Sequence, residues 1–151
     1  MSAPTPARAA PLASKAEVSD WVVALYKAEV KQGIHPVWVK HPTRVFDQAL
    51  SAAIQEDVRL TSDDLGALFY DPMCTCQDPS TMKWTLIDVT PTGAATARVR
   101  MHVDNADPPE NQPTLLMVKT TAGWRIHDVS THDRPSLLDH IRAENAERRR
   151  R

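Results

Sequence analysis

The sequence has little glycine, little cysteine and no long apolar run. Only four of its 151 residues are glycine and two are cysteine. It lacks the motifs of phosphate-binding loops, dinucleotide-binding folds, serine hydrolases and zinc proteases, so these classes lose their usual support. No stretch approaches the roughly 18 apolar residues of a membrane span. No segment has the apolar core, about 7–15 residues long, of a signal peptide. We therefore expect no membrane span, and we find no secretory leader in these residues.

The charge of the chain is nearly balanced overall but uneven along its length. Eighteen basic residues face 19 acidic ones, a net charge of −1, which excludes a generally basic nucleic-acid binder. Arg148 to Arg151 are four consecutive arginines; without them 14 basic residues face 19 acidic ones, a charge of −5. We expect a basic C-terminal tail at 148–151. Two roles of these arginines remain open. They could form a solvated helix end, where positive charge favours the negative end of the helix dipole, or they could contact a phosphate or a partner.

The first 13 residues hold three prolines and five alanines and have no apolar run, so they predict a flexible tail. Residues 14–147 then form the single predicted domain, since 42% hydrophobic and 25% charged residues are typical of a soluble globular protein. The Ala/Pro/Ser character of the tail also resembles the start of a secreted protein after its leader is removed.

Cys74 and Cys76 are the only cysteines and lie two residues apart. Structural metal sites normally need four ligands, so this pair alone gives a weak metal signal. Two structural thiols, a small disulfide ring in an oxidising compartment, and a metal or redox role all remain open. A second candidate metal cluster is spread over a strand, a loop and a helix: His127, His132, Asp133 and His140. We therefore expect no metal, and we expect no cofactor.

Apolar residues recur at helical spacing in the first half of the chain. A helix is predicted over 15–32, because Ser14 and Glu17 form a capping box and Gly33 stands where a helix ends. Residues 34–41 are a predicted connector between two prolines. A second helix is expected to begin near Thr43, with apolar residues at four-residue steps: Phe46, Leu50, Ile54 and Val58. A short third helix is expected through Leu65 and Leu68, with a cap at 61–64 and an end by Asp71.

The period changes from helical to alternating after residue 79. Strands are predicted over 82–90, 95–103, 114–120 and 124–130, with a polar loop at 104–113. Turns at 91–93 and 121–123 contain glycine, and we expect Gly93 at a position that tolerates positive φ. Asp133 is expected to cap a last helix with Pro135 in its first turn. Helices that precede an antiparallel meander predict an α+β fold.

Two short motifs resemble a family of small exported bacterial proteins of unassigned function. The first is Tyr-Asp-Pro-Met-Cys-Thr-Cys-Gln-Asp at 70–78, and the second is Gly-Trp-Arg-Ile-His-Asp-Val at 123–129, before a Ser-Leu-Leu helix. That family has the nuclear-transport-factor-two-like cone fold. The resemblance implies a curved four-stranded sheet around a helix, with a pocket between the concave face and the helices. It also implies a periplasmic protein, with a cytoplasmic location as the alternative.

The predicted pocket residues are Trp84, Trp124 and Asp128. Enzymes of this fold use an Asp, His or Tyr in the cone, so Asp128 is a candidate acid with a raised pKa. The favoured alternative is that Asp128 binds backbone donors or an arginine and holds the end of the sheet, because the sequence places no second acid–base residue beside it. We expect Trp124, Ile126 and Asp128 to share one face of their strand.

The predicted partner-binding residues combine an exposed tryptophan, a basic strand row and the polar loop. They are Trp38, Arg98, Arg100, His102, Asp107 and Glu110. The basic row could bind an acidic surface, or it could be a solvated face with acidic neighbours across the strands. With no catalytic set, the sequence favours a non-enzymatic binding protein, and the resemblance implies that it belongs to the bacterial envelope. The resemblance suggests an immunity protein that neutralises a secreted toxin, as in type VI secretion. The alternatives are a small-molecule cavity enzyme, of the isomerase or dehydratase kind, and a ligand carrier.

Overall fold

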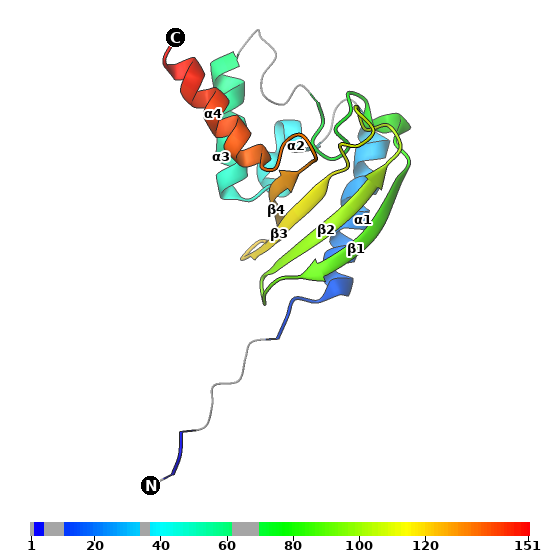
Figure 1. The fold of residues 1–151 in the computed structure, drawn as a ribbon, viewed down its shortest axis with the longest axis vertical. Helices are drawn as coiled ribbons and strands as arrows, with labels where there is room; N and C mark the ends of the chain where they lie inside the picture. The colour runs from blue at the N-terminus through cyan, green and yellow to red at the C-terminus, as the bar shows by residue number, and fades with distance from the viewer. Residues whose placement is uncertain (1, 5–10, 34–36, 62–69) are drawn as a thin grey trace.

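The computed structural model of this protein describes residues 2–4, 11–33, 37–61 and 70–151. Figure 1 shows helices followed by a sheet and a last helix, which confirms the predicted α+β fold. The helical elements are α1 (Lys15–Gln32), α2 (Val37–Lys40), η1 (Pro42–Arg44), α3 (Gln48–Thr61), η2 (Pro79–Thr81) and α4 (Leu137–Arg149). The strands are β1 (Trp84–Pro91), β2 (Thr96–Val103), β3 (Thr114–Thr120) and β4 (Gly123–Ser130). The predicted helix through residues 65–68 lies outside the described residues.

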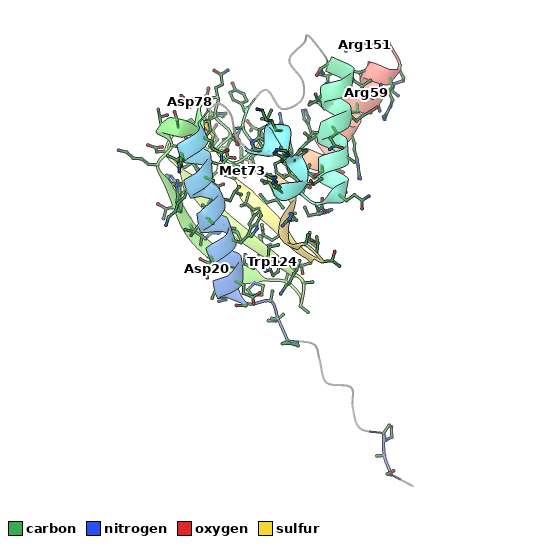
Figure 2. All side chains as sticks on the ribbon, turned by 180° about the vertical axis from the view of Figure 1, so that it is seen from behind. Asp20, Arg59, Met73, Asp78, Trp124 and Arg151 are labelled. Carbon is green, nitrogen blue, oxygen red and sulfur yellow. A yellow bond between two sulfur atoms is a disulfide. The ribbon has the colours of Figure 1, made fainter. Side chains whose placement is uncertain are left out.

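The four strands form a curled antiparallel meander in the order β1-β2-β3-β4. In β2 every second residue is buried, namely Ala97, Val99, Met101 and Val103, and the residues between them are exposed. Seen from behind, α1 crosses this buried face (Figure 2). In Figure 1 the opposite face of β1 and β2 has no described helix in front of it, and α3 and α4 pair beside β4. Alternation thus assigns one face to the core and one to solvent.

The bounds of α1 agree with the prediction because both ends are set by local chemistry. Ser14 accepts a hydrogen bond from the Glu17 amide at 3.2 Å. Gly33 has φ +59°, and its N–H donates to the Glu29 carbonyl at 2.9 Å. A side chain at this glycine would be strained and would lie 3.1 Å from the Ser80 Cβ atom. The helix therefore ends where a residue with left-handed geometry is required.

The second helix starts later than predicted, because the residues before it pair with the sheet. Phe46 forms a parallel bridge with Ile126, whose N–H donates to the Val45 carbonyl at 2.9 Å. The Asp47 N–H donates back to the Ile126 carbonyl at 3.0 Å. Residues 45–47 therefore extend the β4 edge, and α3 begins only at Gln48. Val58 does not join the apolar face; it is 63% exposed.

Two predictions, one about a turn and one about the start of the last helix, are wrong. Gly93 does not adopt positive φ; it is closely packed, since a Cβ there would lie 2.7 Å from Thr96 Oγ1. Asp133 does not cap the last helix: Ser136 accepts from the Asp139 amide at 3.1 Å, and Pro135 precedes the helix. The predicted domain end at residue 147 lies inside α4, which continues to Arg149.

Candidate functional site

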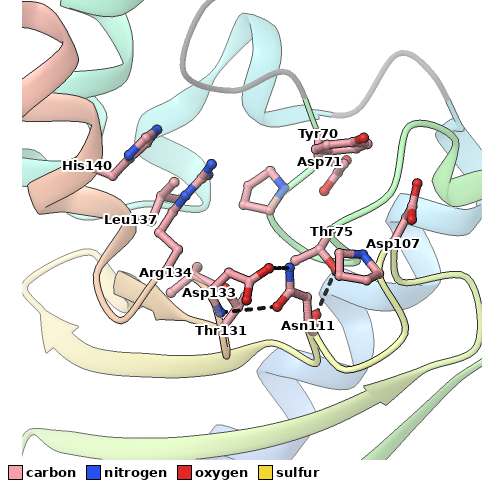
Figure 3. Close-up of a pocket in the computed structure, with 13 residues that line it drawn as sticks. Tyr70, Asp71, Thr75, Asp107, Asn111, Thr131, Asp133, Arg134, Leu137 and His140 are labelled. Carbon is pink, nitrogen blue, oxygen red and sulfur yellow. Dashed lines mark hydrogen bonds between the residues drawn. The ribbon is translucent and has the colours of Figure 1, made fainter.

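A cavity of about 420 Å³ lies where three loops meet the start of α4 (Figure 3). It is therefore at the end of β4, and not between α1 and the concave face of the sheet as expected. Its lining residues come from 70–75, 107–111 and 129–140: Tyr70, Asp71, Pro72, Thr75, Asp107, Pro108, Asn111, Val129, Thr131, Asp133, Arg134, Leu137 and His140. Prolines and aliphatic side chains supply its apolar surface, and the remaining residues bring polar groups toward one space, as in ligand sites.

Hydrogen bonds between distant segments fix one wall of this cavity. Thr75 Oγ1 donates to the Asn111 carbonyl at 2.7 Å, and the Asp107 N–H donates to the Thr75 carbonyl at 3.1 Å. The Asn111 amide donates to Asp133 Oδ2 at 3.1 Å and accepts from the Asp133 N–H at 3.2 Å. The loops at 75, 107–111 and 133 therefore form one connected wall. Figure 3 draws the bonds of Asn111 to Thr75 and Asp133 as dashed lines.

Cys74 and Cys76 form a disulfide directly behind this wall. Both residues are buried, and their Cα atoms are 5.1 Å apart. Of the three alternatives left by the sequence, the structure has the disulfide. Thr75, between them, has φ +51°, which is uncommon for a residue with a branched Cβ. The ring therefore presents Thr75 to the cavity.

The charged side chains in the cavity differ in how they are paired. Among the described residues, the Arg134 guanidinium and the Asp107 carboxylate have neither an ion pair nor a hydrogen bond. The two stand on opposite sides of the cavity in Figure 3. His140 lies on the side of Arg134, and burial together with the positive charge of Arg134 lowers the pKa of its imidazole. The histidine is therefore biased toward its neutral form.

A buried pair of carboxyl groups, Glu29 and Asp71, underlies the opposite side of the cavity. Asp71 lines the cavity yet is only 7% exposed, and Glu29 is 2% exposed. Burial, the negative charge of Asp71 and a hydrogen bond between the two side chains raise the pKa of Glu29 to about 10. Burial raises the pKa of Asp71 as well, opposed by the hydrogen bonds that it accepts. Glu29 therefore carries a proton at neutral pH and donates it to Asp71.

The remaining bonds of Asp71 hold the loop at 71–76 against the helices. Its Oδ1 accepts from the Met73 amide at 2.8 Å, and its Oδ2 accepts from Trp38 Nε1 at 3.3 Å. The Tyr26 hydroxyl donates to the Met73 carbonyl at 2.6 Å, and burial raises the pKa of Tyr26 well above its usual value. Three donors thus bind the Asp71 carboxylate and take up most of its roughly four acceptor positions within the wall.

The predicted aromatic site residues belong to the core. Trp38 is 8% exposed and packs 6.0 Å from the Phe46 ring, so its prediction as an exposed partner anchor is wrong. Trp84 is half-buried, 5.5 Å from the Tyr26 ring. Trp124 is buried, and its indole N–H has no hydrogen-bond partner in the part of the chain that the structure describes. Neither Trp84 nor Trp124 lines the cavity beside α4.

Asp128 is buried but does not line the cavity. A register shift makes His127 an extra residue in β4, so Asp128 lies opposite Leu116 while Ile126 lies opposite Met117. Asp128 and Ile126 therefore do not share a face, contrary to the prediction. The Asp128 carboxylate accepts from the Val129 and Leu138 amides at 2.8 and 2.9 Å and from Ser136 Oγ at 2.5 Å. The favoured alternative is confirmed: Asp128 holds the end of the sheet to the start of α4.

The other predicted partner residues are exposed but not gathered in one place. Arg98, Arg100 and His102 do share the solvent face of β2. Arg100 pairs with Asp88 across the strands at 2.6 Å and holds the pKa of that carboxyl below its usual range. Asp107 lines the cavity, whereas the exposed Glu110 does not. The set therefore divides between a sheet face and the loop at 104–113.

Glu29 and Arg134 are site residues that the sequence analysis missed. Glu29 carries a detectable signal, because it lies three residues after Tyr26 and seven after Val22, on the apolar stripe of α1. Arg134 has no such signal, since it sits in a polar turn whose position depends on the whole fold. The described residues contain no cluster of three or more side chains of the kind that bind metals.

Comparison with known proteins gives one match. The chain is 35% identical over 103 residues to a protein of Escherichia coli (strain K12) described as uncharacterized protein YqhG. The match covers 63% of this chain and 33% of that protein, so the chain spans about a third of the length of the relative that it matches. No family model matches the chain, and no solved structure does. In the part of the chain that the structure describes, no helix is long and apolar enough to cross a membrane.

Proposed function

We propose that this protein is a non-enzymatic binding protein that holds a small organic ligand in the cavity beside α4. The observation that carries the proposal is the cavity of about 420 Å³, whose wall contains the Arg134 guanidinium without a partner among the described residues. Ligand sites are concave, mostly preformed and lined by apolar surface with a few convergent polar groups. The hydrogen-bonded wall from Thr75 through Asn111 to Asp133 makes this site preformed.

The bonds of the cavity acids favour binding over catalysis. A general base needs a free lone pair within reach of a proton on the substrate. The Asp71 carboxylate already accepts from Met73, Trp38 and Glu29. The His140 ring has no hydrogen bond to a described residue that would orient it, as catalytic bases usually have. These groups line a binding site without forming an acid–base set.

The first experiment tests whether this cavity binds small molecules at all. A fragment library is screened by ligand-observed NMR against the wild type, against Thr131→Trp, which fills the cavity, and against Thr121→Trp in the exposed β3–β4 turn. Thr131 is half-buried and lines the cavity. We expect several fragments whose signals disappear with Thr131→Trp and persist with Thr121→Trp. A library in which no signal depends on Thr131 would contradict the proposal.

A second candidate function is recognition of a protein partner in the bacterial envelope, as an immunity protein recognises its toxin. The observation that favours it is the exposed β2 row, in which neither Arg98 nor His102 has an ion pair or a side-chain hydrogen bond with a described residue, although the charge of Arg98 also acts on Asp88. No described helix covers this face (Figure 1). A single acidic patch on a partner would complement the row.

This candidate is tested by co-expressing the protein with toxins encoded beside its gene. Survival is expected with the wild type and with Lys27→Glu on the exposed side of α1, and loss of protection with the double variant Arg98→Glu/His102→Glu. Protection that survives the double variant would exclude the β2 row as the contact surface.

A further inference from the structure

We propose that the ligand of this cavity is a small zwitterion with an apolar body, of the class of free amino acids and short peptides. The inference rests on the proposed function, because it assigns a chemical class to the ligand of the same site. It depends on three features of the cavity wall: a cation and, on the opposite side, an anion, each without a partner among the described residues, and apolar side chains in the same lining.

The Arg134 guanidinium is the reason to expect an anionic group in the ligand. Its guanidinium presents five donors, and among the described residues it has no acceptor. A guanidinium binds a carboxylate through two parallel hydrogen bonds, which fixes orientation as well as charge. The side chain is also partly buried, so a ligand carboxylate there would be less screened by solvent than on an open surface. We assign the ligand carboxylate to this side of the cavity.

The carboxylates of the wall exclude a ligand that is only anionic. Asp107 and Asp133 both line the cavity, and Arg134 alone opposes them, because His140 is biased toward neutrality. Asp133 is bound to Asn111, which leaves Asp107 without a partner among the described residues. A phosphate or dicarboxylate would meet net repulsion, whereas an ammonium group opposite Arg134 would pair with Asp107. The ligand must therefore carry both charges.

The lining of the cavity is partly apolar, and its volume is limited. Pro72, Pro108, Val129 and Leu137 line the cavity. A volume of about 420 Å³ lies near the lower end of ligand sites, which run from roughly 300 to 1,000 Å³. An aliphatic side chain on the zwitterion would cover this surface and gain roughly 25 cal/mol for each Å² removed from water. Leucine and the dipeptide Ala-Leu are suitable probes.

The test measures separately how much the carboxylate and the ammonium group of the probe contribute to binding. Isothermal titration measures Ala-Leu, its N-acetyl derivative and its C-terminal amide against the full-length wild type. We expect each blocked peptide to bind at least tenfold more weakly than the zwitterion. Arg134→Gln should remove the preference for the free carboxylate but keep that for the free amine, and Asp107→Asn should do the reverse. Arg142→Gln on α4 and Glu110→Gln in the same loop are exposed controls that should bind like the wild type.

The outcomes distinguish failure of the proposed ligand class from failure of the proposed binding function. Blocked peptides that bind as well as Ala-Leu, or an unchanged preference in Arg134→Gln with a wild-type melting curve, would overturn the zwitterion. Fragments that depend on Thr131, together with no binding of leucine or Ala-Leu, would reject the zwitterion and leave the proposed function intact. Absence of any Thr131-dependent binding would reject both.

Discussion

Glu29 places an ionisable group on the face of α1 that packs into the core. A buried carboxylate is costly unless it is neutralised or paired. Here the protonated Glu29 donates a hydrogen bond to Asp71, while the second oxygen of Glu29, Oε2, has no hydrogen-bond partner among the described residues. The pair joins α1 to the loop at 71–76, so it supports the cavity wall from behind.

The raised pKa of Glu29 predicts how stability changes with pH. The folded protein keeps a proton on this carboxyl up to pH about 10, whereas the unfolded chain releases it near its ordinary value of 4.5. The folded state therefore binds more protons in this window, and stability falls as pH rises. The slope from one proton is at most about 1.4 kcal/mol per pH unit.

Glu29→Gln removes this proton uptake but retains a donor for Asp71. We expect its free energy of unfolding, measured in urea, to improve relative to the wild type as pH is raised from 5 to 9. Glu110→Gln, an exposed substitution, should follow the wild-type curve. If Glu29→Gln and the wild type run parallel across this range, Glu29 is not protonated in the folded protein.

At the scale of elements, α4 is held by contacts at both of its ends. Asp128 accepts from Leu138 and Ser136 at its start, so the positive end of the helix dipole is already satisfied by a carboxylate. At its other end, Arg148 pairs with the buried Asp57 of α3 at 2.7 Å. Of the four consecutive arginines, Arg148 is thus a structural residue, and Arg149 pairs with Glu56 at 3.1 Å.

Replacing Arg148 is expected to loosen α4 from α3. Its side chain is 18% exposed and that of Asp57 is 3% exposed, so Arg148→Ala removes the guanidinium from a carboxylate that is costly to bury. We expect a loss of about 1–3 kcal/mol in urea unfolding. Arg150→Ala, whose exposed partner Glu147 lies on the same helix, should cost less than about 0.5 kcal/mol. Equal costs for the two variants would show that the Arg148 pair contributes no more than a surface ion pair.

At the scale of the whole molecule, the sheet order determines where the backbone is protected. β2 and β3 have hydrogen-bonded neighbours on both sides, and their inward residues are buried. β4 is covered along part of its outer edge by residues 45–47, whereas β1 is an edge strand with a register shift beside the 49% exposed Ile87. Protection should therefore decrease outward from the two central strands.

Native-state hydrogen exchange followed by mass spectrometry measures this order directly. We expect the slowest exchange in peptides from 96–103 and 114–120, and exchange at least tenfold faster in 84–91 and in the last turn of α4. An unfolded sample supplies the reference for intrinsic exchange. Slowest exchange in α3 and α4 would place the most stable unit of the protein in the helices instead of the sheet.

The sequence by itself determined the α+β class, the bounds of α1 and the central strands. These features follow from local rules: a capping box before α1, a required left-handed Gly33 after it, and strict alternation in β2. The alternative role of Asp128, holding the end of the sheet, also followed from the sequence, because a strand acid without a second acid–base residue is more often structural.

Only the tertiary structure decided the place of the candidate site. The bulge at His127 turned Asp128 to the other face of β4, and the pairing of residues 45–47 with β4 delayed the start of α3. Trp38 is buried, and its indole N–H donates to Asp71, which lies 33 positions away in the chain. Arg134 and Asp107 come to lie on opposite sides of one cavity only when three loops have folded together. Contacts between distant segments leave no periodic signal in a single sequence, which is why periodicity predicted the scaffold and missed the site.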